Sequence, residues 1–588
     1  MKILLIYPYC LEARVHEEEV AVPPLGIFYV GAMLKENKYD VEILNWHGIN
    51  RTPHLIHQTL VEKKPDVIGF SILHANRWGG IEIARIARKI NPEVKIVFGG
   101  IGSTFLCEHL LTHFREVDFA VVGEGEKPFL QLVKRMETGD YDRLEDIRGI
   151  AFRKDSSVLN TGSVEAIQDL DEIPNPAKYF AYQHVAATRG CPGKCTFCGS
   201  PQFWGTRVRF HSPEYFVEQL ELQYRKGITF FYFSDDTFTI KKDHVIRICK
   251  RIIEKDLKIT WVAISRVNYV DEEILYWMRK AGCTQISYGV ESGSEKIRNQ
   301  VLNKKITTDQ IKKAFDLTTR YGILARAYFI YGSPGESWDT IGETLDLMRA
   351  IRPLSVIFYI LDLFPGTALY SDFLRKTGNT DEIWLKQIED ILYFETDPAL
   401  DKEKILAFGQ RLRSEFHKSL PAFVDSIELI GKEDLFEMHA DFLSRLGMTF
   451  SHGDYAGIEE IERKGRMAEN LFEQALVYHP DHRAYLGLGL IHQQNRATEE
   501  SIRVLSEGIR HFPESEQLHM CLGINHMNLQ EYDKALSYFL KFRHSGQFAL
   551  YIARCYEALG DHENREQEAT EHGRPRQCPK GIGKDNRR

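Results

Sequence analysis

The sequence Cys191-Pro-Gly-Lys-Cys195-Thr-Phe-Cys198 places three cysteines in the spacing C-x3-C-x2-C. Three thiolates this close together can bind three corners of a cubane iron–sulfur cluster and leave the fourth iron open for a small molecule. The alternative is a zinc knuckle, but structural zinc usually takes four ligands, and no partnering cysteine pair lies nearby in the sequence. The spacing therefore favours a cluster.

The composition is that of a globular protein with several domains. A chain of 588 residues is too long for one core and predicts three or four domains. The net charge of −8 offers no basic excess for nucleic-acid binding. Ten cysteines are too few for a disulfide scaffold, so we expect a reducing cytoplasm. No apolar run reaches membrane-spanning length, and the apolar start is too short for a signal peptide.

The first 150 residues alternate short apolar segments with helical ones. Such alternation predicts a doubly wound parallel α/β sheet, which binds ligands at the carboxyl ends of its strands. Helices are expected at 27–36 and 80–90, among others. The expected strands are 3–7, 41–45, 67–71, 95–98 and 119–122.

Small and polar residues follow several of these strands. Glycines there let the backbone approach a bulky flat ligand, and a serine can hydrogen-bond it. Ordinary strand-to-helix turns explain each of these residues taken singly. The candidates are Ser71, Gly99, Gly100, Gly123, Glu124 and Gly125, together with Pro24 before the first helix.

A second alternating region spans residues 184–370, after a linker at 151–183 that is rich in turn signals. Its six strand–helix units predict a partial parallel (β/α)6 barrel with its chemistry at the strand ends. The expected strands are 184–188, 230–234, 259–263, 285–288, 325–330 and 355–361.

The remainder of the chain is expected to be helical. Residues 371–465 form a charged connecting region, and residues 466–560 carry a repeat of about 34 residues typical of tetratricopeptide arrays. Residues 561–588, basic and rich in Gly and Pro toward the end, are predicted to be disordered. In the repeat, the spacing of Ala468, Phe472, Ala475 and Pro480 recurs at Ser501, Leu505, Gly508 and Pro513.

The three cysteines, with Phe197 just before the last, resemble the signature of the radical SAM superfamily. The segments Pro23-Pro-Leu-Gly26 and Gly123-Glu-Gly-Glu126 resemble the cobalamin-binding domain of its B12-dependent branch. The resemblance implies three cofactors: a [4Fe–4S] cluster, S-adenosylmethionine (SAM) and cobalamin. The D-x-H-x-x-G motif of better-known cobalamin domains is absent after the first strand, where Pro8-Tyr-Cys10 stands. The resemblance therefore implies that the lower face of cobalt is open or held by another group.

The resemblance also assigns site residues. It gives Cys191, Cys195 and Cys198 to the cluster. Toward SAM, Ser234, Asp235 and Asp236 would meet the amino group, Arg266 the carboxylate, Glu291 the ribose or amino group, and Ile330 and Gly332 the adenine. Phe197 would lie beside the cluster and SAM, and the strand-end residues above would contact cobalamin. The Asp pair could instead cap the next helix, and Arg207 and Arg209 are either anion contacts or solvated charges.

The reaction implied is radical methylation of an unactivated carbon in a lipid, a natural product or a peptide. Two alternatives stay open: a cobalamin-dependent cyclase or ring-rearranging enzyme, and an interaction protein that acts through its repeats with degenerate catalytic domains. An electron donor such as flavodoxin or ferredoxin is expected, and the repeat array offers a surface for a protein partner.

Overall fold

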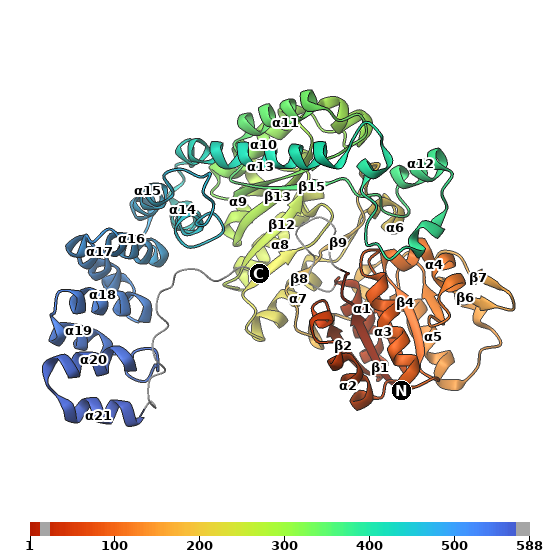
Figure 1. Ribbon diagram of the computed structural model, residues 1–588, viewed down its shortest axis with the longest axis horizontal. Coiled ribbons are helices and arrows are strands. Elements are labelled where there is room, and N and C mark those ends of the chain that lie inside the picture. Colours follow the sequence, from red (N-terminus) through yellow and green to blue (C-terminus); the bar gives the residue numbers. More distant parts are fainter. Residues whose placement is uncertain (12–23, 572–588) are drawn as a thin grey trace. The chain divides into compact units, whose positions relative to one another are not determined.

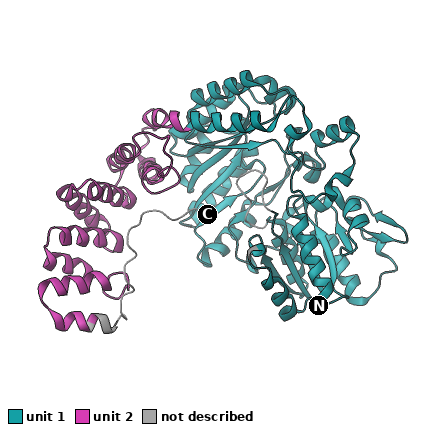
Figure 2. Cartoon of the chain, in the orientation of Figure 1, with its two compact units in different colours: residues 1–416 teal, residues 417–588 magenta. Residues whose placement is uncertain are grey.

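The computed structural model describes residues 1–11 and 24–571 (Figure 1). The chain divides into two compact units, residues 1–416 and 417–588 (Figure 2). Within the described residues, no helix combines the length and the apolar character needed to cross a membrane.

The first sheet has seven strands in the order β2-β1-β3-β4-β5-β6-β7. The first five are parallel, which confirms the predicted doubly wound sheet. They are β1 (Lys2–Tyr7), β2 (Asp40–Asn45), β3 (Val67–Ser71), β4 (Lys95–Gly99) and β5 (Phe119–Val121). The helices between and after them are α1 (Gly26–Glu36), α2 (His54–Lys63), α3 (Arg77–Ile90), α4 (Ile101–His113) and α5 (Glu126–Thr138).

Part of the predicted linker at 151–183 belongs to this sheet. β6 (Ile150–Lys154) pairs antiparallel with β5, and β7 (Ser157–Asn160) pairs antiparallel with β6. The turn between them places Asp155 at φ 53°, a left-handed conformation that Asp tolerates well. Ile150 and Phe152 are buried, so hydrophobic packing draws the hairpin onto the sheet edge.

The second sheet has six parallel strands in the order β15-β14-β13-β12-β11-β8, which confirms the predicted open barrel (Figure 1). They are β8 (His184–Val185), β11 (Phe230–Phe233), β12 (Thr260–Ser265), β13 (Cys283–Glu291), β14 (Leu324–Tyr331) and β15 (Ser355–Ile360). Intervening helices are α7 (Pro213–Arg225), α8 (Lys242–Glu254), α9 (Glu272–Lys280), α10 (Thr308–Arg320) and α11 (Trp338–Ile351).

The first barrel strand is shorter than the predicted 184–188. The chain leaves the sheet after Val185, and β9 (Thr188–Arg189) pairs instead with β10 (Arg209–Phe210) in a small antiparallel ladder. The buried side chain of Asp235, two residues after β11, explains the departure. Asp235 accepts hydrogen bonds from Ala187 N at 3.2 Å and Thr188 Oγ1 at 2.5 Å, which turns this segment toward the cysteines.

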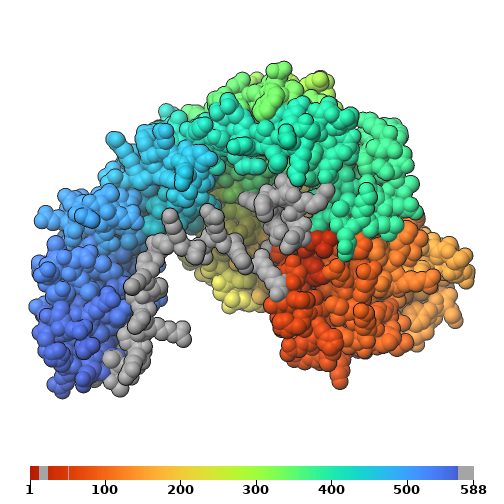
Figure 3. Space-filling model, viewed as in Figure 1, coloured from red at the N-terminus to blue at the C-terminus, as the bar shows by residue number. Residues whose placement is uncertain are grey.

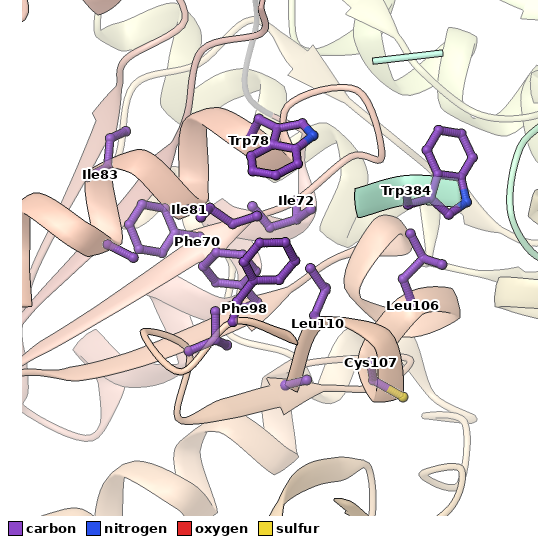
Figure 4. Packing of buried hydrophobic residues seen from close by; sticks show 14 of the residues in the cluster. Phe70, Ile72, Trp78, Ile81, Ile83, Phe98, Leu106, Cys107, Leu110 and Trp384 are labelled. Carbon is purple, nitrogen blue, oxygen red and sulfur yellow. The ribbon is translucent and has the colours of Figure 1, made fainter. Parts of the chain in front are cut away.

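Residues after the barrel cover the first sheet. Trp384 is fully buried in the core that also holds Phe70, Trp78 and Leu106 (Figure 4). Arg77 donates to the carbonyl of Ile388 at 2.5 Å, and Trp78 donates to that of Lys386 at 3.0 Å. The segment around α12 (Ala368–Thr377) packs against the part of the chain that forms the first sheet (Figure 3). The region predicted only as a connector thus ties the two sheets together.

The second unit is a run of antiparallel helices. Glycines allow close helix packing at equivalent positions 34 residues apart: a Cβ atom at Gly489 would overlap Leu505, and one at Gly523 would overlap Phe539. The helices are α13 (Lys402–Asp425), which begins in the first unit, α14 (Phe436–Ser451), α15 (Lys464–Tyr478), α16 (His482–Gln494), α17 (Thr498–His511), α18 (Glu516–Asn528), α19 (Tyr532–Leu540), α20 (Ala549–Leu559) and α21 (His562–Glu571).

The predicted disorder from residue 561 is wrong for its first part. α21 is helical, and its Glu568 is buried against Arg543, whose Nε lies 2.9 Å away. Asp561 supports the helix start by accepting from Asn564 N at 3.1 Å. This ion pair and cap hold a helix whose sequence is almost entirely polar. The rest of the predicted tail, 572–588, lies outside the described residues.

Candidate active site

The three cysteines share one loop between β9 and α6 (Ser200–Trp204). All three thiols are free and partly exposed. A Cβ atom at Gly193 would lie 3.4 Å from Cys191 Sγ and 3.7 Å from Cys195 Sγ, so both sulfurs face one spot. Cys198 N donates to Cys195 O at 3.3 Å, which folds the last cysteine back on the second.

The donor set fits a cluster better than a single ion. Among residues 1–11 and 24–571, no three or more His, Cys, Asp or Glu side chains converge to hold one metal ion. A cubane accepts sulfurs that lie further apart than the ligands of one ion, because each cysteine binds a different iron. Three thiols from one loop, next to a fixed cation, are suitable ligands for a cluster.

That cation is Arg266, which follows β12. Its Nη1 lies 3.7 Å from Cys195 Sγ, and its Nη2 donates to the carbonyl of Lys304. Burial raises the pKa of the Cys198 thiol to about 11, so this group loses its proton only when a metal takes the proton's place. Arg266 stabilises the negative charge that thiolate ligation brings.

The cysteine loop is anchored from two sides. Thr196 N donates to Leu302 O at 3.1 Å, and Thr196 Oγ1 donates to Val301 O at 2.8 Å. Leu369 N, at the start of α12, donates to Thr196 O at 3.0 Å. Phe197 packs against the core of the first sheet. These contacts hold the loop between the two sheets.

The Ser234–Asp236 segment splits into two kinds of residue. Ser234 and Asp236 are exposed; Ser234 Oγ lies 2.9 Å from His184 Nδ1, and Asp236 accepts from Ser200 Oγ at 2.5 Å. Asp235 is 1% exposed, and both of its oxygens are bonded to the β8–β9 segment. The expectation that Asp235 meets the SAM amino group is therefore corrected: its carboxylate anchors the approach to the cysteines.

Glu291 ends β13 in a left-handed conformation, φ 68°. Its carboxylate is buried and pairs with Lys304 Nζ at 2.5 Å. A Cβ atom at Gly289 would overlap both groups, so the pair occupies the space that this glycine leaves. Lys304 was absent from the sequence-based candidates, because a lysine in a polar turn carries no local signal.

Ile330 and Gly332 lie where β14 ends. Ile330 is partly buried, between the buried Phe329 and Tyr331 on the strand. Gly332 has φ 79°, and its N–H donates to Glu336, which also accepts from Ser333 N at 3.0 Å. Burial raises the pKa of Glu336 to about 7. At Gly332 the chain therefore presents its backbone, with no side chain, at the end of β14.

A cavity of about 280 Å³ lies at the carboxyl ends of the first sheet. Its surface is largely apolar, with Ile27, Val97 and Phe129 among the lining residues. A Cβ atom at Gly100, whose φ is 93°, would lie 2.8 Å from Ile72 O, so only glycine fits there. All seven predicted cobalamin residues line the cavity: Pro24, Ser71, Gly99, Gly100, Gly123, Glu124 and Gly125.

Glu124 lines the cavity, but its carboxylate is bonded to residues outside it. One oxygen pairs with Arg209, and the other lies 3.4 Å from Arg189 Nη1 and accepts from Ile167 N at 3.2 Å. Arg209 is buried by its pairing with Glu124 and is therefore not available to an anionic ligand, whereas Arg207 is exposed. Glu124 therefore contributes its backbone to the cavity wall.

The cysteine loop and the cavity share a wall. α6 starts two residues after Cys198, and its Phe203 and Trp204 line the cavity. Arg189 stacks over the Trp204 ring at 5.1 Å and pairs with Glu126 Oε1 at 2.5 Å. No residue of α6 was among the sequence-based candidates, because Phe and Trp in a short helix are usually part of the hydrophobic core.

The comparisons with known proteins agree with this geometry. Residues 13–133 match the B12 binding domain model, and residues 185–348 match the Radical SAM superfamily model. The chain belongs to the cobalamin-dependent radical SAM enzymes.

The chain is similar to several known proteins. An uncharacterized methyltransferase of Pyrococcus horikoshii is 31% identical over 457 residues, covering 76% of this chain and 97% of the relative. The anaerobic magnesium-protoporphyrin IX monomethyl ester cyclase of Rubrivivax gelatinosus is 28% identical, covering 65% and 71%. In fold, the chain resembles the radical SAM methyltransferase TsrM of Kitasatospora setae, solved with cobalamin and a [4Fe-4S] cluster, with a TM-score of 0.58, 16% identity, and coverage of 81% and 100%.

Proposed function

We propose that this chain methylates an unactivated carbon, with Cys191, Cys195 and Cys198 as ligands of a [4Fe–4S] cluster. When bound, the cluster with SAM supplies an organic radical and the corrinoid supplies a methyl group. The observation that carries the proposal is the shared wall: α6 joins the cysteine loop to the glycine-lined cavity. Two cofactors on either side of one short helix can reach one substrate.

The chain's own residues bind and orient. Arg266, beside Cys195, is proposed to meet the SAM carboxylate as a fork. The exposed Ser234 and Asp236 are proposed for the amino group, and Glu291 for the ribose. Ile330 and the backbone of Gly332 are proposed to flank the adenine. Asp235 is proposed to act indirectly, as a positioning residue, because it fixes the segment that leads to the cysteines.

The cavity is proposed to hold the corrinoid. Gly99, Gly100, Gly123 and Gly125 let a large flat ligand approach the backbone, and Ser71 can donate a hydrogen bond. None of the lining residues in the described part of the chain is a histidine. A corrinoid bound here would therefore meet no imidazole among the described residues that line this cavity.

Methylation is preferred to cyclisation because the Pyrococcus horikoshii relative, which is matched over 97% of its length, bears a methyltransferase name. Cyclisation is the second candidate, since the magnesium-protoporphyrin ester cyclase is also a relative. The substrate is proposed to be a lipid, a natural product or a peptide. The reductant is proposed to be a flavodoxin or ferredoxin in the cytoplasm, and the helical array to offer a surface for a protein partner.

The test is anaerobic reconstitution of the full chain with iron, sulfide and cobalamin. With reductant and SAM, we expect 5′-deoxyadenosine from the wild type and none from Cys195→Ala. With candidate substrates, S-adenosylhomocysteine and label transfer from methyl-deuterated SAM indicate methylation. 5′-Deoxyadenosine without S-adenosylhomocysteine favours the cyclase. A fully loaded protein that forms neither product would favour an interaction protein.

A further inference from the structure

The inner face of the second sheet can be read from its register. Residues at paired positions of parallel strands share a face. Tyr232 pairs with His184 and with Val262, and Ser287 pairs with Ile264 and Arg326. The alternate residues of β14 are buried, so the helices pack on that other side and the first set faces the lumen of the barrel.

This lumen is apolar and open. Tyr232 is 41% exposed and Ile264 is 38% exposed, although the strand residues next to them are buried. Large apolar side chains held on a rigid concave sheet and left uncovered are typical of a binding surface. The apolar face consists of Tyr232, Ile264, Tyr328, Ile330, Ile357 and Tyr359.

One cation stands on this face. Among the described strand residues that face the lumen, Arg326 carries a charge that no ion pair neutralises. The carboxylate of Glu291, which lies beside Gly289 on the same face, is neutralised by Lys304. Arg326 Nε donates to Ser355 Oγ at 2.9 Å, which fixes the guanidinium along the sheet. In the described part of the chain Arg326 forms no ion pair. A guanidinium among apolar side chains is stabilised when an anion joins it.

We propose that Arg326 binds an anionic oxygen group, a carboxylate or a phosphate monoester, on a substrate whose apolar body lies along the lumen. The inference rests on the proposed function, since it assumes that the reaction occurs at the strand ends. Ile330 lies four residues beyond Arg326 on β14, a rise of about 13 Å. The substrate is therefore elongated, with its reacting carbon about that far from its anionic end.

The experiment uses the full chain loaded anaerobically with cluster and cobalamin. The probe is the fluorescent dansylaminoundecanoic acid, compared with its methyl ester, which has the same body without the charge. We expect the acid to bind at least about tenfold more tightly than the ester. Arg326→Gln should remove this preference, and Arg326→Lys should keep part of it. The control Arg320→Gln, an exposed arginine at the end of α10, should change nothing.

Equal affinity for acid and ester, or an unchanged preference in Arg326→Gln, would overturn the proposal. If Arg326→Gln does not fold, the wild type still decides, because added salt should weaken binding of the acid and not of the ester. Displacement of the probe by dodecanoate or by dodecyl phosphate separates the two anion sources. 5′-Deoxyadenosine formation is measured on the same samples, so a failure of the radical chemistry is distinguished from a failure of the anion site.

Discussion

Lys304 Nζ lies 2.5 Å from a carboxylate oxygen of Glu291, and both side chains are buried. The pair stands at the end of β13, in the region proposed for SAM. Each partner cancels the charge of the other where water cannot reach it. Arg266 joins the same group by donating to the carbonyl of Lys304, so the cysteine loop, the cation and the ion pair form one contiguous unit.

Breaking this pair should destabilise the first unit. Lys304→Met leaves a buried carboxylate without a partner, which costs about 3–5 kcal/mol. All seven tryptophans lie within residues 1–416, so tryptophan fluorescence in urea reports on this unit alone. The double variant Glu291→Gln/Lys304→Met should recover most of the loss. The exposed pair Arg375–Asp372 is the control, and Arg375→Met should change stability by less than about 1 kcal/mol.

Arg189 should control corrinoid retention although it does not line the cavity. It pairs with Glu126 and stacks on Trp204, both of which do line it. Arg189→Met removes the fork and the charge, and we expect corrinoid affinity to fall at least about tenfold, with a smaller fall for Arg189→Lys. Gel filtration followed by absorbance measures the bound corrinoid. The exposed Arg207→Met is the matched control, and equal retention in both Met variants would refute a positioning role for Arg189.

Short-range patterns predicted much of this molecule. β3 was predicted to the residue because an apolar run ends at a polar strand terminus. The cysteines needed no tertiary information, because all three lie in one loop. The cavity glycines Gly99, Gly100, Gly123 and Gly125 follow strands that were themselves predicted. Features of this kind depend on neighbours in the chain.

What sequence reasoning missed depends on partners far apart in the chain. Lys304 belongs to the site only because β13 brings Glu291 beside it. Asp235 was predicted to contact SAM, but both of its carboxyl oxygens accept hydrogen bonds from the β8–β9 segment. Trp384 looked like part of a connector and is core of the first sheet. In each case burial, which the sequence does not display, decides what the residue does.

The cavity should be sensitive to volume at Gly99. A Cβ atom there would lie 3.8 Å from Phe70 O and from Val121 Cβ, an ordinary contact. Gly99→Ala should therefore fold and bind cobalamin nearly as the wild type does. Gly99→Leu should fill the cavity and weaken cobalamin binding at least about tenfold, with little change in urea stability. Gly342→Leu, in α11, where a Cβ atom would have open space around it, is the control. If Gly99→Leu binds cobalamin normally, this cavity is not the corrinoid site.

Asp235 should make the stability of the first unit depend on pH. Burial raises its pKa from 3.8 to about 7. Between about pH 4 and 7 the folded state therefore holds a proton that the unfolded state has released, and stability is lost as pH rises through this window. Asp235→Asn cannot ionise, and its amide can keep bonds to Thr188 and Ala187. The free energy of unfolding of Asp235→Asn relative to the wild type should rise by about 2 kcal/mol from pH 5 to pH 8.

The comparison isolates one group, because every other titrating residue is shared by the two proteins. Exposed Asp316→Asn on α10 serves as the control, and its difference from the wild type should stay flat across the same range. A flat difference for Asp235→Asn as well would mean that Asp235 is ionised in the folded state at every pH tested. Its two hydrogen bonds would then outweigh its burial, and the approach to the cysteines would be held by a charged anchor instead of a neutral one.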